Sequence, residues 1–176
     1  MSARKPSTSV FLDTSAFIPM LLGSHKLHGK LHQHLKSINA SIGIDAVVLS
    51  EYLVGLNDSV DKDKLIETLT KESKVSSFDP RVAKVCAELF RILKAKGLIP
   101  STPTERQITK VDIMIMASAI VCRAHEFIFE DKHFTAYPEA LPESICRYSL
   151  PEFVRISKLP DVLVQTSFEE IRNDGA

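Results

Sequence analysis

Two carboxylates of this sequence closely follow short apolar runs. Asp13 ends the run at residues 10–12, and Asp131 comes just after the run at residues 127–129. Apolar runs of this length that end in polar residues are typical of buried parallel strands. Because open α/β sheets bind ligands at the carboxyl ends of their strands, we expect both acids at a ligand-binding edge. Taken alone, Asp13 is better explained as a helix-capping residue, although Ser15 is the predicted N-cap of the following helix.

Two further carboxylates lie in predicted apolar helices. Glu51 is the only charged residue of the segment at residues 47–56, and Asp112 is the only acid of the segment at residues 109–123. An unpaired carboxylate is costly to bury, so each must reach water or meet a partner. Each also has a structural alternative: Glu51 could reach the surface, and Asp112, in the predicted first turn, could be stabilised by the helix dipole.

The four acids together indicate metal-dependent chemistry on phosphates. If their elements converge at one sheet edge, the carboxylates repel one another and need a counter-charge. Mg²⁺ and Mn²⁺ prefer oxygen ligands and commonly serve phosphate chemistry. Such an ion lowers the pKa of a bound water and polarises a phosphoryl oxygen. Each acid by itself has a structural explanation, but the joint placement of all four favours a metal site.

The pattern of the remaining chain predicts an α/β fold. Short apolar runs alternate with helical stripes, which indicates helical crossovers between parallel strands. We therefore expect a single three-layer domain with a mostly parallel central sheet flanked by helices. The expected strands are 10–12, 42–44, 75–78, 127–129 and a short one at 153–156; the expected helices are 17–22, 26–38, 47–56, 61–73, 80–96 (capped by Asp79), 109–123 and 166–172, with a loop at 100–104.

Composition sets the broad class of the protein. The chain has 176 residues, enough for one domain, and its formal net charge is zero, with 22 basic and 22 acidic residues. No global attraction to nucleic acid follows, but a surface outside an acidic site must then be net basic. Three widely spaced cysteines predict neither a zinc knuckle nor a disulfide framework. Without a signal-peptide core or a membrane-length apolar run, we expect a soluble cytoplasmic protein with no membrane association.

Four motifs around these acids resemble those of PIN-domain ribonucleases, most closely the toxin component of bacterial VapBC-type toxin–antitoxin pairs. The resemblance covers residues 10–134. One departure is Phe129, where the family usually has a threonine two positions before its last acid. The motifs are Leu12-Asp13-Thr14-Ser15, Ser50-Glu51-Tyr52-Leu53-Val54-Gly55, Asp112-Ile113-Met114-Ile115-Met116-Ala117-Ser118-Ala119 and Asp131-Lys132-His133-Phe134.

The resemblance implies an endoribonuclease that uses Mg²⁺ or Mn²⁺ to hydrolyse phosphodiester bonds of single-stranded or loop RNA. It also implies a small antitoxin partner and a homodimer. Thr14 and Ser15 become supporting residues for Asp13 or for the water. The implied catalytic and metal-binding residues are Asp13, Glu51, Asp112 and Asp131, and the candidate phosphate contacts, each equally explained as solvated surface charge, are Arg106, Lys110, Arg123 and Lys132.

We predict a polar tail at 1–9, the PIN-like domain at 10–156 and a C-terminal extension at 157–176. Two other functions need weighing. A haloacid-dehalogenase phosphatase requires a second Asp two residues after the first, where this chain has Ser15. A catalytically weakened PIN fold that serves as a binding or scaffold protein is the stronger alternative, since Phe129 and the neutral net charge are compatible with it.

Overall fold

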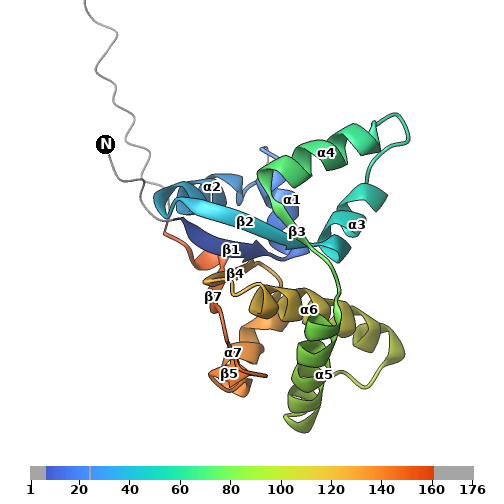
Figure 1. The fold of residues 1–176 in the computed structure, drawn as a ribbon, viewed down its shortest axis with the longest axis vertical. Coiled ribbons are helices and arrows are strands. Elements are labelled where there is room, and N and C mark those ends of the chain that lie inside the picture. The colour runs from blue at the N-terminus through green and yellow to red at the C-terminus, as the bar shows by residue number, and fades with distance from the viewer. Residues whose placement is uncertain (1–6, 24, 161–176) are drawn as a thin grey trace, which may run out of the picture.

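A five-stranded parallel sheet forms the centre of the protein. The computed structural model describes residues 7–23 and 25–160. The strands follow the order β3-β2-β1-β4-β7, and every neighbouring pair is parallel (Figure 1). The predicted α/β class is confirmed, and the short strand expected near the end of the chain is the fifth strand of the sheet. The strands are β1 (Thr8–Leu12), β2 (Ala40–Asp45), β3 (Lys74–Ser76), β4 (Glu126–Phe129) and β7 (Glu152–Arg155).

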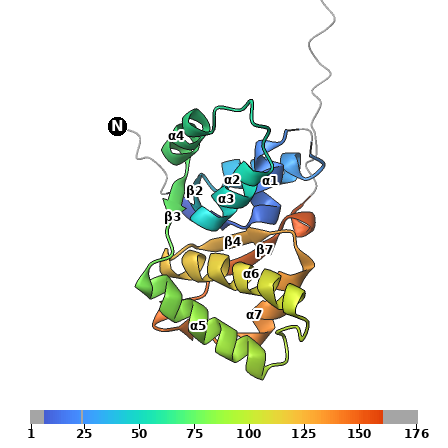
Figure 2. The same ribbon diagram turned by 90° about the vertical axis from the view of Figure 1, so that its right-hand side faces the viewer.

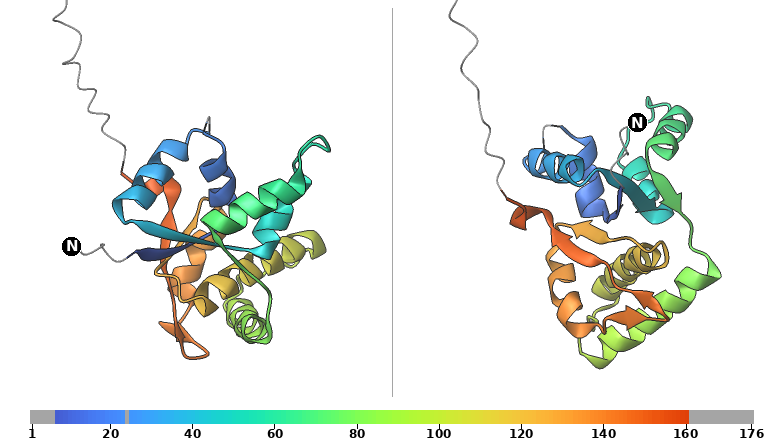
Figure 3. Two further views of the ribbon diagram at one scale, coloured as in Figure 1. Left: turned by 45° about the horizontal axis from the view of Figure 1, so that its top comes forward. Right: turned by 60° about the vertical axis from the view of Figure 1, so that its left-hand side comes forward.

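Helices cover both faces of this sheet, as the three-layer prediction requires. Helices α1 to α4 lie on one side and α5, α6 and α7 on the other (Figure 2). A small antiparallel pair, β5 (Ser144–Ile145) with β6 (Tyr148–Ser149), lies near α7 and α5 (Figure 3). The helices are α1 (Thr14–Leu21), α2 (His28–Ser37), α3 (Ala46–Val54), α4 (Lys62–Glu72), α5 (Pro80–Ala95), α6 (Pro103–Val121) and α7 (Tyr137–Ala140), with 3₁₀ turns η1 (Lys132–Ala136) and η2 (Ile156–Lys158).

Helix α6 begins six residues before the predicted start at Thr109. Thr102 is its N-cap residue, Pro103 occupies the first turn, and the Thr102 hydroxyl donates to a carboxylate oxygen of Glu105 at 2.5 Å. Proline is favoured at the start of a helix, and Thr followed three residues later by Glu is a helix-start pattern. The predicted loop at 100–104 is therefore partly helical. Asp112 consequently lies in the middle of α6, so the helix dipole of a first turn does not explain it.

The start of α1 also differs from the prediction. Asp13, not Ser15, is the N-cap residue, and its Oδ2 accepts the backbone N–H of Ser15 at 3.0 Å. The expectation for α5 is confirmed, since Asp79 caps this helix through the N–H groups of Arg81 and Val82. The helix expected at 166–172 lies outside the described residues.

Aromatic rings fill the core beside β4. Phe127 packs against Phe129, Phe134 and Phe153 at ring-centroid distances of 5.1–6.0 Å. Phe129 is only 2% exposed, so its side chain belongs to the core. The three cysteines are free and partly buried. No helix in residues 7–23 and 25–160 is long and apolar enough to cross a membrane.

Candidate functional site

All four acids line one cleft, whose volume is about 380 Å³. They come from four separated parts of the chain, two at strand ends and two on helices. A shared cleft of this kind is what a joint chemical role requires, whereas four independent structural acids need not converge. The lining residues are Asp13, Thr14, Ser15, Ile18, Pro19, His25, Glu51, Asp112 and Asp131.

Neighbouring strands bring Asp13 and Asp131 to the same edge. β1 and β4 are parallel, and the backbone N–H of Asp13 donates to the carbonyl of Ile128 at 3.0 Å. The carboxyl ends of both strands therefore coincide. Asp131 follows β4 and caps η1, where its Oδ1 accepts the N–H of His133 at 2.9 Å. Capping and placement in the cleft are thus compatible for both acids.

The hydroxyl of Ser15 joins these two strand ends. Its Oγ donates to Asp13 Oδ2 at 2.6 Å, and it accepts the backbone N–H groups of Glu130 at 2.8 Å and Asp131 at 3.2 Å. One hydroxyl therefore fixes both the first acid and the backbone that carries the last one. The sequence assigned Ser15 only a supporting role, and the buried Phe129 does not reach the cleft lining.

Glu130 extends the same network to the edge strand. Its carboxylate accepts from Arg155 Nη2 at 3.2 Å and from the backbone N–H of Ser157 at 2.8 Å. Arg155 is the last residue of β7, and its Nε is buried without a hydrogen-bond partner. The segment that carries Asp131 is thus held from two sides, by Ser15 and by the end of β7.

The two helical acids are positioned by a buried contact between α3 and α6. Ser118 of α6 donates to Asp45 Oδ2 at 2.5 Å, while Asp45 Oδ1 caps α3 by accepting the N–H of Val47 at 2.8 Å. A buried carboxylate oxygen that loses its donor costs about 1–3 kcal/mol. This contact therefore fixes the two helices that carry Glu51 and Asp112. On the cleft side, Glu51 is exposed and accepts a hydrogen bond from the Thr14 hydroxyl.

Asp112 has a strongly perturbed electrostatic environment. Burial is the main cause that raises its pKa from 3.8 to about 7, and the charges of the other three acids raise it further. Its Oδ2 is buried without a hydrogen-bond partner. Burial also raises the pKa of Asp13, although its hydrogen bonds with Ser15 oppose that shift. A carboxyl that resists ionisation among like charges is the expected partner of a cation.

The donor set fits a hard divalent cation in its chemistry. Every acid of the cleft offers carboxylate oxygens, which Mg²⁺ and Mn²⁺ prefer, and the unpartnered Oδ2 of Asp112 is available as a ligand. As the side chains lie, however, no three His, Cys, Asp or Glu residues of the described chain are already arranged around an ion position. An ion held by three or more of these carboxylates therefore requires them to draw together by side-chain rotation, whereas one or two carboxylates with waters can also hold Mg²⁺.

The predicted phosphate contacts do not line the cleft. Arg106 instead donates to the carbonyls of Ser101 at 2.7 Å and Pro100 at 3.4 Å, in the turn before its own helix. Lys110 and Lys132 are exposed beside the acids in sequence but are not lining residues. Arg123 follows the C-terminal end of α6 with a positive φ of 55°. Their role as phosphate contacts stays a prediction.

Two residues near the acids carry no sequence signal. His25 lines the cleft from the segment between α1 and α2, and its Nδ1 accepts the N–H of Leu27 at 3.2 Å. Tyr137 is buried, and burial, followed by the charges of Asp112 and Asp131, raises its pKa to about 12. Both positions depend on how distant segments pack together, so no motif spacing identified them.

A family model described as PIN domain matches residues 10–140. This range includes all four acids and the segments between them. No curated protein matches the sequence significantly.

Solved toxin–antitoxin complexes share the fold. The chain resembles VapBC-1 from nontypeable Haemophilus influenzae with a TM-score of 0.59 and 16% identity over 86% of this chain and 100% of that one. It resembles VapBC2 from Rickettsia felis, bound to a promoter DNA fragment, with a TM-score of 0.57 and 18% identity over 84% and 98%. For VapBC-5 from Mycobacterium tuberculosis the TM-score is 0.52, with 19% identity over 84% and 98%. At such low identity the similarity concerns the fold alone.

Proposed function

The chain belongs to the PIN-domain family, and we propose on this basis that it is a metal-dependent endoribonuclease. The proposed reaction is hydrolysis of phosphodiester bonds in single-stranded or loop RNA. The observation that carries the proposal is the acidic cleft, where Asp112 keeps a buried, unpartnered carboxylate oxygen among three further acids. Such a group is stable when a cation neutralises it.

In the proposed mechanism, Asp13, Asp112 and Glu51 would hold the principal Mg²⁺ or Mn²⁺ ion, and Asp131 would complete the site or hold a second ion. A bound ion supplies a water of lowered pKa and polarises a phosphoryl oxygen. Ser15 orients Asp13 through the 2.6 Å hydrogen bond. Because burial and the neighbouring acids raise the pKa of Asp112 to about 7, this carboxyl would have to give up a proton in part of the molecules to hold an ion near neutral pH.

No protein side chain attacks the substrate in this mechanism. Water adds to the phosphorus in line with the leaving oxygen and loses a proton, the bond from phosphorus to O3′ breaks, and the 3′ oxygen takes up a proton, so that no net proton is gained or lost. The products are a 5′-phosphate and a 3′-hydroxyl.

We expect purified protein to cleave RNA that contains exposed loops when Mg²⁺ or Mn²⁺ is present, and to stop when EDTA is added, because carboxylates alone do not activate water on a phosphate. Gel analysis of a labelled RNA gives the rate, and phosphatase and ligase treatment identifies the ends. Asp13→Asn is the negative control. Cleavage that survives both EDTA and Asp13→Asn would refute the mechanism, and absence of cleavage with either metal would favour a binding or scaffold role.

We also propose that this ribonuclease is the toxin of a toxin–antitoxin pair and acts in the cytoplasm as a homodimer. The similarity in fold to the toxin–antitoxin complexes supports this proposal. The partner would cover the acidic cleft, and an arginine from it would supply positive charge to the four acids and exclude substrate.

Expression of the chain alone is expected to slow growth, because unrestrained RNA cleavage stops protein synthesis. Co-expression with the partner is expected to restore growth, and the two proteins should copurify as a complex whose mass native mass spectrometry can measure. Asp13→Asn provides the matched control, since it should be harmless when expressed alone. Unaffected growth together with the absence of a small copurifying protein would contradict the toxin assignment. The ribonuclease assignment is tested separately by the cleavage assay.

A further inference from the structure

One long stretch of the chain contains no acid. Between Asp13 and Asp45 the sequence has no Asp or Glu, although the chain as a whole has equal numbers of acidic and basic residues. Helix α2 (His28–Ser37) lies within this stretch. The positive charge that balances the acidic cleft is therefore concentrated partly around this helix. The basic residues of the stretch are Lys26, Lys30 and Lys36, with His25, His28, His32 and His34.

Helix α2 is attached to the rim of the acidic cleft by two hydrogen bonds. His25 lines the cleft, and its Nδ1 accepts the N–H of Leu27, the N-cap residue of α2. His28, the first residue of α2, contacts the carbonyl of Pro19 through Nδ1 at 3.1 Å, and Pro19 also lines the cleft. The acid-free helix therefore begins where the acidic cleft ends.

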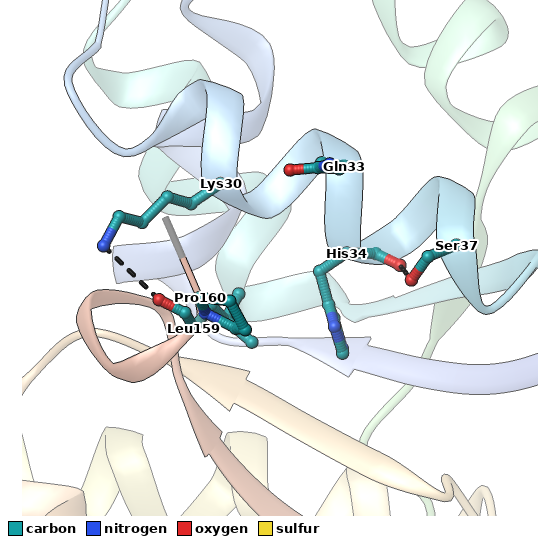
Figure 4. A pocket seen from close by; sticks show the side chains of 6 residues that line it. All are labelled: Lys30, Gln33, His34, Ser37, Leu159 and Pro160. Carbon is teal, nitrogen blue, oxygen red and sulfur yellow. Dashed lines mark hydrogen bonds between the residues drawn. The ribbon is translucent and has the colours of Figure 1, made fainter. Parts of the chain in front are cut away.

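A groove of about 230 Å³ runs beside α2 (Figure 4). One wall is a line of polar side chains at helical spacing i, i+3, i+4 and i+7, and the other is the segment Leu159–Pro160. Leu31 and Leu35 of α2 are buried in the core. The polar line thus lies beside the core-facing side of α2, with His34 pointing toward the sheet. It consists of Lys30, Gln33, His34 and Ser37.

Two side-chain contacts hold the walls of the groove in place. Lys30 Nζ donates to the carbonyl of Leu159 at 3.3 Å, and His34 Nε2 lies 2.7 Å from a carboxylate oxygen of Glu126 on β4. The first contact holds the two walls together, and the second fixes α2 on the sheet. On the adjoining side of α2, Lys36 and His32 are exposed, as is Lys26 before the helix.

We propose that α2 and this groove bind the sugar–phosphate backbone of the RNA strand that is cleaved in the acidic cleft. The inference rests on the proposed ribonuclease function and adds where the strand lies. A cleft of four carboxylates repels phosphates, so the attraction for the strand must come from adjacent cations. Lysines and polar side chains form hydrogen bonds with phosphates whatever the RNA sequence. This surface therefore suits a contact with the sugar–phosphate backbone more than a contact with the bases.

Helix α5 (Pro80–Ala95) is the other helix with surplus lysines, and it is a poorer candidate. Its two arginines are paired, Arg81 with Asp79 and Arg91 with Glu88, each at 2.6 Å. None of its residues lines the acidic cleft. It therefore offers a matched control: Lys84 and Lys94 of the helix and Lys96 directly after it are exposed and can be replaced with the same loss of charge.

The test compares two triple variants with wild type in binding to a labelled single-stranded RNA, in EDTA so that no cleavage occurs. Replacement of Lys26, Lys30 and Lys36 by Gln is expected to weaken binding and to lower the slope of log affinity against log salt by about 2, since each lost phosphate contact lowers it by about 0.7. The matched Lys84, Lys94 and Lys96 variant should keep the wild-type slope. Fluorescence anisotropy over a salt series measures both.

Lys30 also contacts Leu159, so its replacement could disturb the groove itself. The double variant Lys26→Gln, Lys36→Gln leaves Lys30 in place and serves as a second test, with an expected slope change of about 1.4. Thermal melts verify that each variant is folded. If the α2 and α5 variants have equal slopes of log affinity against log salt, the inference is wrong. Cleavage of RNA by wild type would still support the ribonuclease function in that case. Loss of antitoxin binding without loss of RNA binding would reassign the surface to the protein partner. Wild type that neither binds nor cleaves RNA would contradict both proposals.

Discussion

Asp112→Asn is expected to stabilise the metal-free protein near neutral pH and at the same time to abolish RNA cleavage. Asparagine keeps the shape of the side chain but removes a charge that lies partly buried among three other acids. A gain in stability would therefore reflect relief from burying this charge and, to a smaller extent, from its repulsion by the other acids.

The pH dependence of this gain follows from the raised pKa of Asp112. A carboxyl whose folded pKa is about 7, raised from 3.8, binds its proton more tightly in the folded state. The resulting penalty is absent below the unfolded pKa and grows until the pH passes the folded pKa. The variant should match wild type near pH 4 and exceed it by roughly 2 kcal/mol at and above neutral pH, after allowance for solvent screening. Urea denaturation in EDTA measures this difference.

Divalent metal should reverse the order of the two proteins. Saturating Mn²⁺ stabilises wild type by about 2.7 kcal/mol at a hundredfold excess over the dissociation constant, and Asp112→Asn should lose most of this response. Asp58→Asn, which removes a fully exposed acid outside the cleft, is the matched control and should change neither quantity. If Asp112→Asn destabilises the metal-free protein and keeps the Mn²⁺ response, the assignment of Asp112 to the metal site is wrong.

Ser15→Ala is expected to lower kcat by about 100-fold with little change in RNA affinity. The Ser15 hydroxyl holds Asp13 and the backbone of Glu130 and Asp131 together. A displacement of about 1 Å in a catalytic group can cost about 100-fold in rate. The stability should also fall by about 1–3 kcal/mol, because polar groups lose their partner. Single-turnover cleavage and RNA binding, measured separately, distinguish the two effects.

Two further variants serve as controls for the Ser15→Ala prediction. Ser50→Ala removes an exposed hydroxyl next to Glu51 and should leave the rate unchanged. Ser15→Thr keeps the hydroxyl and should recover part of the activity. If Ser15→Ala lowers stability alone and cleaves at the wild-type rate, then Ser15 has a structural role and Asp13 does not depend on it.

The sequence predicted those features that depend on local patterns. Asp13 and Asp131 were placed at strand ends because apolar runs precede them, and Asp79 with Pro80 is a local helix-start signal. The start of α6 was placed too late because its first two turns are exposed and polar, so they lack the apolar periodicity that reveals a helix. The helix-start pattern at Thr102 to Glu105 indicates the true beginning of α6, which hydrophobic periodicity does not reveal.

The features missed were those that depend on packing between distant segments. Ser15 was expected to cap α1, but Asp13 occupies that position and leaves the Ser15 hydroxyl to bind the backbone after β4. His25 and Tyr137 reach the acids only in the folded chain. Basic residues next to the acids in sequence did not line the cleft, because a short separation along the chain does not determine the direction of a long side chain.

The position of β4 between β1 and β7 bears on when the protein first becomes active during its own synthesis. The pairing of Val10 with Glu126 joins segments far apart in the chain, and the Glu130 contacts with Arg155 and Ser157 come from a still later segment. Pairings between distant segments form slowly and late in folding. A nascent chain that still lacks β4 already contains Asp13, Glu51 and Asp112, but it lacks Asp131 and the backbone after β4 that Ser15 joins to Asp13. On the proposed ribonuclease function, we therefore expect ribosome-bound fragments that end before β7 to be inactive, so that the ribosome and the messenger being translated are exposed to cleavage only once β4 and β7 have been synthesised.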